Sequence, residues 1–440
     1  MDNKIVVGLD IGTTKIVAIV GRKNEHGKLE ILGVGKASSD GGVIRGMVAN
    51  IDKTVRAINK ALADAEEQSG VNISSVNVGI AGHHIKSAMH HGCIILDTVD
   101  SEISSKDVRR LSNDMYKMVT PPGNEIIHVM PQDYMVDYEP GFKDPVGMSG
   151  VRLESDFHVI TAHKTAISNI NKCVKRSGVS NKGELDIENL ILEPMASSLA
   201  VLSDEDKEAG VVLVDIGGGT TDVAIFHDGI IRHTAVIPFG GNIITQDIKD
   251  GLSVMQNQAE QLKVKFGKAI DAEAKSNEIV SIPGLRGREP KEISLKNLAG
   301  VIQARMEDII ELVHDEIVRS GLQGRLATGM VLTGGGAQLQ YVSQLFEYMT
   351  GMDVAIGIPN EHLGKSGFDF VKSPMYSTGI GLVLAGFTTI DNRKSNFADV
   401  AEPIAGNKVL KRDKSSSFFK SILEKTKDLI LDDNLDNSDY

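Results

Sequence analysis

The strongest constraint on the fold is a short string that the chain contains twice, about 200 residues apart. The first copy reads D-I-G-T-T-K from Asp10, and the second reads D-I-G-G-G-T-T-D from Asp215. Each copy follows an apolar run and precedes a run of β-branched residues, which is the pattern of two strands joined by a tight turn. We therefore expect a β-hairpin at each copy.

The segments around the two copies repeat in the same order. The elements predicted around the first copy are strands at 4–20 and 29–34, a helix at 51–67 and a strand at 76–81. Those predicted around the second are strands at 211–215, 223–226 and 230–237, followed by a helical stretch. Duplication of a whole subdomain explains this order better than chance, so we expect an α/β fold with two related lobes that face each other.

Both predicted turns have the composition of a phosphate-binding site, because backbone N–H groups in a tight glycine-rich turn bind an anion without desolvating side chains. The turn residues are Gly12, Thr13, Thr14 and Lys15 in the first copy and Gly217, Gly218, Gly219 and Thr220 in the second. Asp10 and Asp215 precede the turns, and carboxylates beside phosphates hold Mg²⁺ through its retained waters. One copy alone could equally be an ordinary β-turn. Two copies predict a clamp on the polyphosphate of a nucleotide such as ATP.

A third glycine cluster, Gly334, Gly335 and Gly336, follows an apolar strand that begins at Val331. Such a turn lets a flat base and its ribose lie against bare backbone. A glycine triplet alone is more often a plain strand-to-helix turn, so its weight comes from being the third of a set. The sequence G-K-S at Gly364 is no Walker loop, because Pro359 stands where that motif needs its first glycine.

Charge and cysteine content exclude several classes of protein. The chain of 440 residues has 47 basic and 59 acidic side chains and a formal charge of −12, so we expect no nucleic-acid partner. Cys93 and Cys173 cannot form a disulfide framework, and we expect both to be buried. The histidine pairs at His83 and His90 lack acidic or cysteine partners at metal-ligand spacing, and we expect them at the surface. The sequence shows no export signal and no run of ~20 apolar residues.

The end of the chain changes character. Lys, Asn, Asp and Ser dominate the segment 391–416, which predicts a flexible linker. At 417–431, residues at the spacing of an amphipathic helix follow, with apolar and basic members Phe418, Phe419, Ile422, Leu423, Lys425, Leu429 and Ile430. This helix could pack on its own domain, dock on a partner or lie on a membrane. Its lysines and paired phenylalanines fit an anchor on anionic lipid, which the acidic tail at 432–440 opposes unless it points away.

The hairpins and the third glycine cluster, in this order, resemble the actin, Hsp70 and sugar-kinase superfamily. Within it, the sequence resembles the FtsA family of bacterial cell division proteins. The phrases that carry this resemblance are GLDIGTTK, LILEPMASSLAVL, VLVDIGGGTTDVAIF, AEQLKVKFG, VLTGGGAQL and SPMYSTGIGLVLAG. The resemblance spans nearly the whole chain and implies a two-lobed actin-like ATPase fold, with a subdomain inserted in the first lobe.

The resemblance and the sequence pattern together divide the chain into regions. We expect the first lobe at 1–82 and 161–200, the inserted subdomain at 83–160, and the second lobe at 201–390 with its outer subdomain at about 243–325. The linker at 391–416, the amphipathic helix at 417–431 and the acidic tail at 432–440 follow.

The resemblance also implies roles that the pattern alone would not assign. Glu193 would orient the attacking water near Mg²⁺, with Asp10 and Asp215 as the other catalytic carboxylates. Thr221 would join the second phosphate site. Glu260 and Lys263, one helical turn apart, would flank the adenosine opposite the third glycine cluster.

Members of the family implied by this resemblance polymerise like actin on the cytoplasmic face of the inner membrane at the division site. They tether FtsZ there by binding its C-terminal peptide through the outer part of the second lobe, and they recruit later division proteins. Any hydrolysis would be weak and Mg²⁺-dependent. A small-molecule kinase of the same superfamily would need a second, substrate-binding cleft. An actin-like pilus or microcompartment assembly protein would differ in its partner, and the chain ends too early for the peptide-binding domain of an Hsp70-type chaperone.

Overall fold

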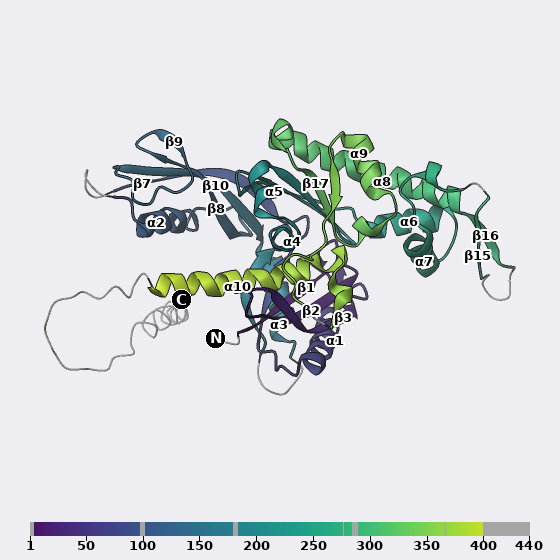
Figure 1. Ribbon diagram of the computed structural model, residues 1–440. Helices are drawn as coiled ribbons and strands as arrows, with labels where there is room; N and C mark the ends of the chain where they lie inside the picture. Colours follow the sequence, from purple (N-terminus) through teal and green to yellow (C-terminus); the bar gives the residue numbers. More distant parts are fainter. Residues whose placement is uncertain are drawn as a thin grey trace, which may run out of the picture. The chain divides into compact units, whose positions relative to one another are not determined.

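The computed structural model describes residues 4–96, 102–178, 184–275, 277–283, 289–365 and 367–398. The chain divides into two compact units, Met1–Asp391 and Asn392–Tyr440, and the fold described below is that of the first (Figure 1). The predicted amphipathic helix at 417–431 and the acidic tail lie outside the described residues, as does most of the predicted linker.

The first lobe is built on a five-stranded sheet whose strand order is β11-β6-β1-β2-β3. Its strands are β1 (Ile5–Ile11), β2 (Lys15–Lys23), β3 (Leu29–Ser38), β6 (Ser75–Ile80) and β11 (Asp186–Leu192). β1 runs antiparallel to β2 and parallel to β6. The helices α1 (Ile51–Ser69) and α3 (Lys164–Lys175) and the small β4–β5 pair (Val43–Ile44 and Met47–Val48) complete this lobe.

The second lobe repeats this sheet, with strand order β14-β13-β12-β17-β18. Its strands are β12 (Val211–Ile216), β13 (Thr221–His227), β14 (Ile230–Ile237), β17 (Gly329–Thr333) and β18 (Val354–Ile356). β12 is antiparallel to β13 and parallel to β17, just as β1 is to β2 and β6. The predicted duplication of two lobes is therefore confirmed.

An inserted domain separates β6 from α3 in the first lobe. It contains β7 (Lys86–Ile95), α2 (Ser105–Met115), β8 (Asn124–Val136), β9 (Glu139–Phe142) and β10 (Arg152–His163). Its sheet has the order β7-β10-β8-β9 and a hydrophobic core of its own, in which Leu111, Leu153 and Phe157 are buried. The predicted insertion in the first lobe is confirmed.

The outer part of the second lobe is mainly helical. It comprises α6 (Gly241–Gly251), α7 (Gln256–Phe266), η1 (Asp271–Glu273), β15 (Ile279–Ile282), β16 (Lys291–Ser294) and α8 (Leu295–Ser320). The polar stretch 268–290 contains η1 and the strand β15, which pairs with β16. Ser294 caps the N-terminus of α8, because its side chain accepts a hydrogen bond from the Asn297 backbone N–H.

The remaining elements connect the lobes or cover their sheets. They are α4 (Glu193–Val201), α5 (Asp204–Ala209), η3 (Gln323–Arg325), η4 (Gly336–Gln338), α9 (Val342–Thr350), η5 (Asp369–Val371), η6 (Pro374–Tyr376) and α10 (Ser377–Ala398). α4 starts directly after β11, and this places Glu193 at the end of the first-lobe sheet.

Two predictions of burial are wrong. Cys93 is exposed, because it lies on the outer face of β7 while its neighbours Gly92 and Ile94 face the core of the inserted domain. His84 is buried, with only 2% of its surface exposed, because it packs between Gly82 and the ring of His163 where both ends of the inserted domain leave the first lobe. Sequence periodicity could not show that packing.

Candidate functional site

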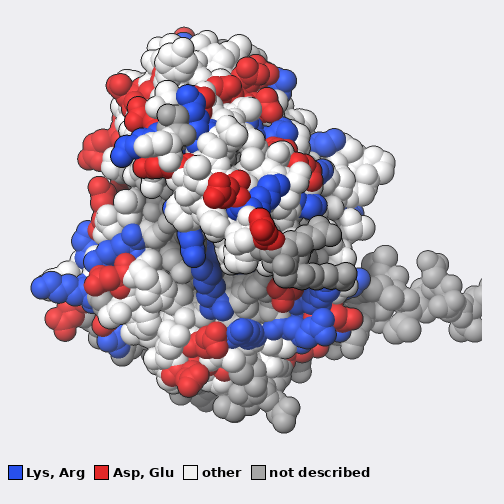
Figure 2. Space-filling view, turned by 90° about the vertical axis from the view of Figure 1, so that its right-hand side faces the viewer, with Lys and Arg blue, Asp and Glu red and all other residues white. Residues whose placement is uncertain are grey.

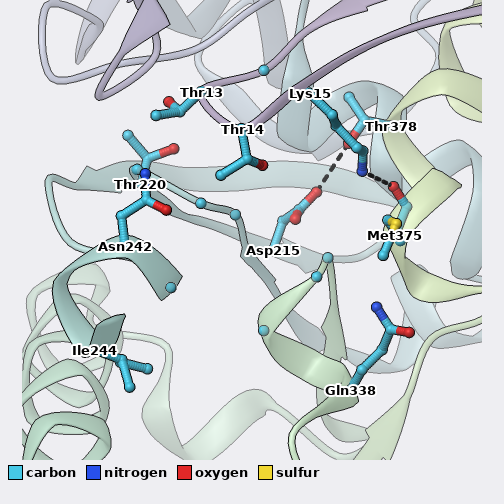
Figure 3. A pocket seen from close by; sticks show the side chains of 18 of the residues that line it. Thr13, Thr14, Lys15, Asp215, Thr220, Asn242, Ile244, Gln338, Met375 and Thr378 are labelled. Carbon is cyan, nitrogen blue, oxygen red and sulfur yellow. Dashed lines mark hydrogen bonds between the residues drawn. The ribbon is translucent and has the colours of Figure 1, made fainter. Parts of the chain in front are cut away.

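The two duplicated hairpins face a single cavity of about 510 Å³. It collects nearly all of the predicted phosphate, adenosine and catalytic residues: Asp10, Gly12, Thr13, Thr14, Lys15, Glu193, Asp215, Gly217, Gly218, Gly219, Thr220, Glu260, Lys263, Gly334, Gly335 and Gly336. Thr221 does not line the cavity, because its side chain is buried and its hydroxyl donates to the Phe239 carbonyl. In Figure 3, Thr13 and Thr14 reach into the cavity from the first hairpin and Gln338 from the opposite side.

The tips of the two hairpins touch. A methyl group placed on Gly218 would lie 2.4 Å from Cγ2 of Thr14, and one placed on Gly219 would lie 2.5 Å from Oγ1 of Thr13. Both distances are shorter than any real contact between such atoms, so the glycines let the two turns approach. The backbone N–H groups of both turns are thus concentrated in one place, as an anion site requires.

Asp215 is held by hydroxyl groups from two other elements, of which Thr378 is labelled in Figure 3. Ser197 on α4 donates to its Oδ2 over 2.7 Å, and Thr378 on α10 donates to the same oxygen over 3.1 Å. Burial raises the pKa of Asp215, while these two hydroxyls lower it. The result is an oriented carboxylate whose second oxygen, Oδ1, lies under Gly334, where an added methyl group would come within 2.3 Å of it.

Lys15 supplies the positive charge at the first hairpin. Its Nζ donates to the Met375 carbonyl (Figure 3) and lies 5.4 Å from the centre of the Tyr376 ring. Burial lowers the pKa of Lys15, and the charges of Asp10 and Asp215 raise it. An ammonium group in this position can contact a phosphate oxygen and still be stabilised by the charges of the two carboxylates.

Four carboxyl groups surround the bottom of the cavity. Burial raises the pKa of Asp10 to about 6, against the lowering effect of Lys15. Burial and the charge of Asp10 raise the pKa of Glu193 well above its usual range. Burial and Asp215 raise the pKa of Asp222 to about 8. A bound cation would reduce the electrostatic repulsion among these four carboxyl groups. Carboxylate oxygens are hard ligands, which suit Mg²⁺ with its waters.

Asp222 is a site residue that the sequence analysis missed. It lies opposite Asp215 on β13, is 4% exposed, and its Oδ1 has no hydrogen-bond partner among the described residues. In the first lobe the equivalent position, opposite Asp10, is Val17. Asp222 is the last residue of the string D-I-G-G-G-T-T-D. Successive side chains of a strand point to opposite faces, so Asp222, and not Thr221, lies on the cavity face. This alternation could have identified Asp222 from the sequence.

The far side of the cavity has a different chemistry. Lys263 on α7 donates to the Gly241 carbonyl over 2.8 Å and to the Thr245 hydroxyl over 2.7 Å, and it pairs with Glu260 at 2.8 Å. Asn242, Ile244, Val264, Gln338 and Leu339 also line the cavity, and the sequence analysis did not single them out. It also did not single out Lys36, Gly46, Met375 and Thr378, of which the last three contact Thr13, Lys15 and Asp215 respectively. Apolar and amide side chains with bare glycine backbone suit a flat base and a ribose.

The molecular surface carries charges of both signs. On the face shown in Figure 2, acidic and basic side chains are interspersed, with a column of basic side chains near its middle. None of the helices in the described part of the chain combines the length and apolar content that a membrane crossing needs.

Two family models match the chain. The model of the cell division protein FtsA matches residues 212–381, and the model of the SHS2 domain inserted in FtsA matches residues 82–161. The second match falls on the inserted domain.

Curated relatives cover most of the chain. The cell division protein FtsA of Pseudomonas aeruginosa is 41% identical over 383 residues, which cover 87% of this chain and 89% of the relative. The protein of the same name from Escherichia coli K12 is 36% identical over 392 residues, which cover 88% and 91%.

Solved structures with low sequence identity share the fold alone. A chain of the PilM–PilN type IV pilus biogenesis complex is 14% identical and has a TM-score of 0.61, over 87% of this chain and 98% of that one. The ethanolamine utilization protein EutJ of Carboxydothermus hydrogenoformans is 17% identical and has a TM-score of 0.50, over 87% and 90%.

Proposed function

The chain belongs to the FtsA family of cell division proteins, and on that premise we propose that its cleft holds Mg²⁺ and ATP as a switch for self-assembly. The family resemblance predicted from the sequence, with its actin-like fold, is confirmed. In the proposed function, the protein assembles on the cytoplasmic face of the inner membrane at the division site. It tethers FtsZ there and recruits later division proteins.

The observation that carries the nucleotide proposal is the meeting of the two hairpins over one carboxylate cluster. Their backbone N–H groups and Lys15 complement a polyphosphate, and Asp10 and Asp215 would hold Mg²⁺ through its waters. Lys263, Glu260 and the glycines of the third cluster would enclose the adenosine. All of these residues line the cavity, and this supports the proposal.

Bound ATP would supply the phosphoanhydride bond that water cleaves by in-line attack, and Mg²⁺ would neutralise negative charge on the phosphates. The contribution of this chain would be to orient that water through Glu193 and to stabilise negative charge through Lys15 and the hairpin N–H groups. The raised pKa of Glu193 suits a group that accepts a proton. These residues serve the nucleotide and the attacking water, and none is assigned to a second substrate. We therefore propose that hydrolysis is slow and that it limits the lifetime of an assembled state.

The membrane and FtsZ parts of the proposal rest on the family and on the sequence. The helix predicted at 417–431, with Phe418 and Phe419, would lie on anionic lipid, and the linker would let it do so while the lobes assemble. The outer part of the second lobe, which contains α7 and α8, would bind the C-terminal peptide of FtsZ.

Co-sedimentation with liposomes tests the whole proposal. The full chain would be mixed with vesicles that contain anionic lipid, with and without Mg²⁺ and ATP, and with and without a peptide of the FtsZ C-terminus. We expect the protein to pellet with the vesicles, to retain the peptide, and to pellet more completely when ATP is present. If the protein stays in the supernatant under all these conditions, the proposed membrane function is wrong.

A further inference from the structure

The inserted domain contacts the strand that carries Glu193. The backbone N–H of Leu192, the last residue of β11, donates a hydrogen bond to Nε2 of His128 on β8 over 3.1 Å. β11 is an edge strand of the first-lobe sheet, so a backbone donor on its outer side finds no partner within that sheet. His128 satisfies this donor one residue before Glu193.

This hydrogen bond fixes the tautomer of the His128 imidazole. Because Nε2 accepts the hydrogen bond, the ring proton of the neutral form resides on Nδ1. Burial lowers the pKa of His128 to about 4, so the ring stays neutral and keeps its acceptor near neutral pH. Protonation of the ring therefore does not break the contact near neutral pH.

Glu193 has little freedom to move once Leu192 is fixed. Its carboxyl lies over β6, where a methyl group placed on Gly79 would come within 2.9 Å of the Glu193 Cγ. Leu192 is also the residue at which β11 ends and α4 begins, with extended backbone angles of φ −61° and ψ 126°. A shift of Leu192 would therefore change the direction in which α4 starts and the position of the Glu193 carboxyl.

The same strand β8 is attached to the second lobe four residues further on. Gln132 donates through Nε2 to the Ile231 carbonyl on β14 over 3.1 Å, and it is buried. Asp133 pairs with Arg232 at 2.9 Å, and the Arg232 side chain is only 16% exposed. Two further strands of the inserted domain contact β14 at Thr234, through Ser87 and His158.

β8 thus spans the two lobes, with His128 on the first and Gln132 and Asp133 on the second (Figure 1). These attachments lie about 13 Å apart along the strand. Between these attachments β8 pairs with β10 from His128 to Pro131, and β9 joins it from Tyr134 onward, so the strand is held in the sheet and transmits a displacement at one end to the other. Any rotation of the second lobe that accompanies a change in the cleft would pull on β14, and through β8 on Leu192.

We propose that His128 is a positioning residue for Glu193, and that β8 ties this position to the second lobe through Arg232. The inserted domain would thereby couple the arrangement of the lobes to the rate of ATP hydrolysis. The catalytic part of this inference rests on the proposed function, whereas the physical link between β8 and Leu192 does not.

The test of the link uses the nucleotide-free full chain. Amide hydrogen exchange is measured in a peptide that contains Leu192 for the parent, for His128→Ala, for His128→Gln and for Arg232→Ala. The Leu192 amide should exchange about tenfold faster in His128→Ala, close to the parental rate in His128→Gln, whose side-chain oxygen can accept the bond, and faster also in Arg232→Ala. The control is His26→Ala, an exposed loop substitution that should leave the exchange unchanged. Unchanged exchange in both His128→Ala and Arg232→Ala would overturn the inference.

The catalytic consequence is read from kinetics on the same proteins. We expect His128→Ala and Arg232→Ala each to lower kcat for ATP hydrolysis by about tenfold while the affinity for Mg²⁺·ATP stays within about twofold. The double variant should lose less than the product of the two single losses, because both act through one strand. A double variant whose fold loss in kcat equals the product of the two single losses would show that the two contacts are independent. That result would contradict the coupling. If the parent neither binds nor hydrolyses ATP, the proposed function fails, and the exchange measurement still decides the link.

Discussion

Asp215 and Asp222 lie directly opposite each other on the antiparallel strands β12 and β13, and both face the cavity between the lobes. Residues paired in this way have Cβ atoms about 5 Å apart, so two ionised carboxyl groups repel each other there. Lobe one has no such pair, because Val17 stands opposite Asp10. The second hairpin therefore carries an excess negative charge that a bound cation would neutralise.

This pair predicts how the stability of the nucleotide-free protein depends on pH. The pKa of Asp222 is raised to about 8 in the folded protein, against about 4 in an unfolded chain. Between these values the folded state binds more protons than the unfolded state, so this group makes the protein less stable as pH rises through the window. Asp222→Asn removes that contribution.

Thermal unfolding of the two proteins without nucleotide checks this prediction. The melting temperature of Asp222→Asn, relative to the parent, should increase by several degrees between about pH 5 and about pH 8. A difference that is the same at both pH values would mean that Asp222 does not titrate in this window.

Glu193 is predicted to act in hydrolysis and not in binding. Glu193→Gln keeps the shape of the side chain but removes a carboxylate that can orient and deprotonate water. We expect ATP hydrolysis to fall by roughly a hundredfold, with Mg²⁺·ATP affinity unchanged or slightly higher because a buried negative charge is lost. Steady-state phosphate release and equilibrium titration measure the two quantities. Hydrolysis at the parental rate would exclude this role for Glu193.

Lys263 is predicted to serve the adenosine side of the cleft. It joins α6 to α7 through its bonds to the Gly241 carbonyl and the Thr245 hydroxyl. Lys263→Met should therefore weaken ATP and ADP by the same factor, about three- to tenfold, because the two nucleotides share their adenosine. Competition with a fluorescent nucleotide measures both affinities. A loss confined to ATP would place Lys263 at the γ-phosphate instead.

The end of the chain is predicted to bind lipid. Deletion of residues 418–440 should release the protein from vesicles that contain anionic lipid, while the affinity for Mg²⁺·ATP stays the same because the cavity is lined by residues between Asp10 and Thr378. A matched variant, Phe418→Ala with Phe419→Ala, should weaken lipid binding while it keeps every lysine and the acidic tail. Equal sedimentation of the truncated and full-length chains would remove the anchor from the account.

The sequence predicted the duplicated hairpins and most of the cavity lining because these features are local. A tight turn between two apolar strands is encoded by a few adjacent residues, and its two copies implied two lobes. Asp222 was missed for a different reason, since its role depends on which residue of β13 pairs with Asp215. Thr378 contacts Asp215, and His128 contacts Leu192 beside Glu193, from elements far away in the chain. Single-sequence patterns carry no information on such contacts.

The errors in burial have the same origin. His84 was expected at the surface because a polar pair in a connecting segment is usually solvated, yet it is enclosed by the junction of the inserted domain with the first lobe. Cys93 was expected to be buried from its residue type, yet it falls on the exposed face of an edge strand. In both cases tertiary position outweighed the tendency of the residue type.

The central claim is that the two hairpins close on one polyphosphate, and Gly218 tests it most directly. A side chain at Gly218 would collide with Thr14, so Gly218→Val should force the two hairpins apart and weaken the phosphate site. Gly324→Val is the matched control, since an added methyl group there meets nothing within 4 Å.

Calorimetric titration with Mg²⁺·ATP on the parent and both variants, each shown to unfold at a similar temperature, gives the decisive comparison. We expect the parent and the control Gly324→Val to bind with equal affinity, and Gly218→Val to bind at least about a hundredfold more weakly. Equal affinity in all three proteins, or no binding to the parent, would contradict the claim that the hairpins close on a polyphosphate.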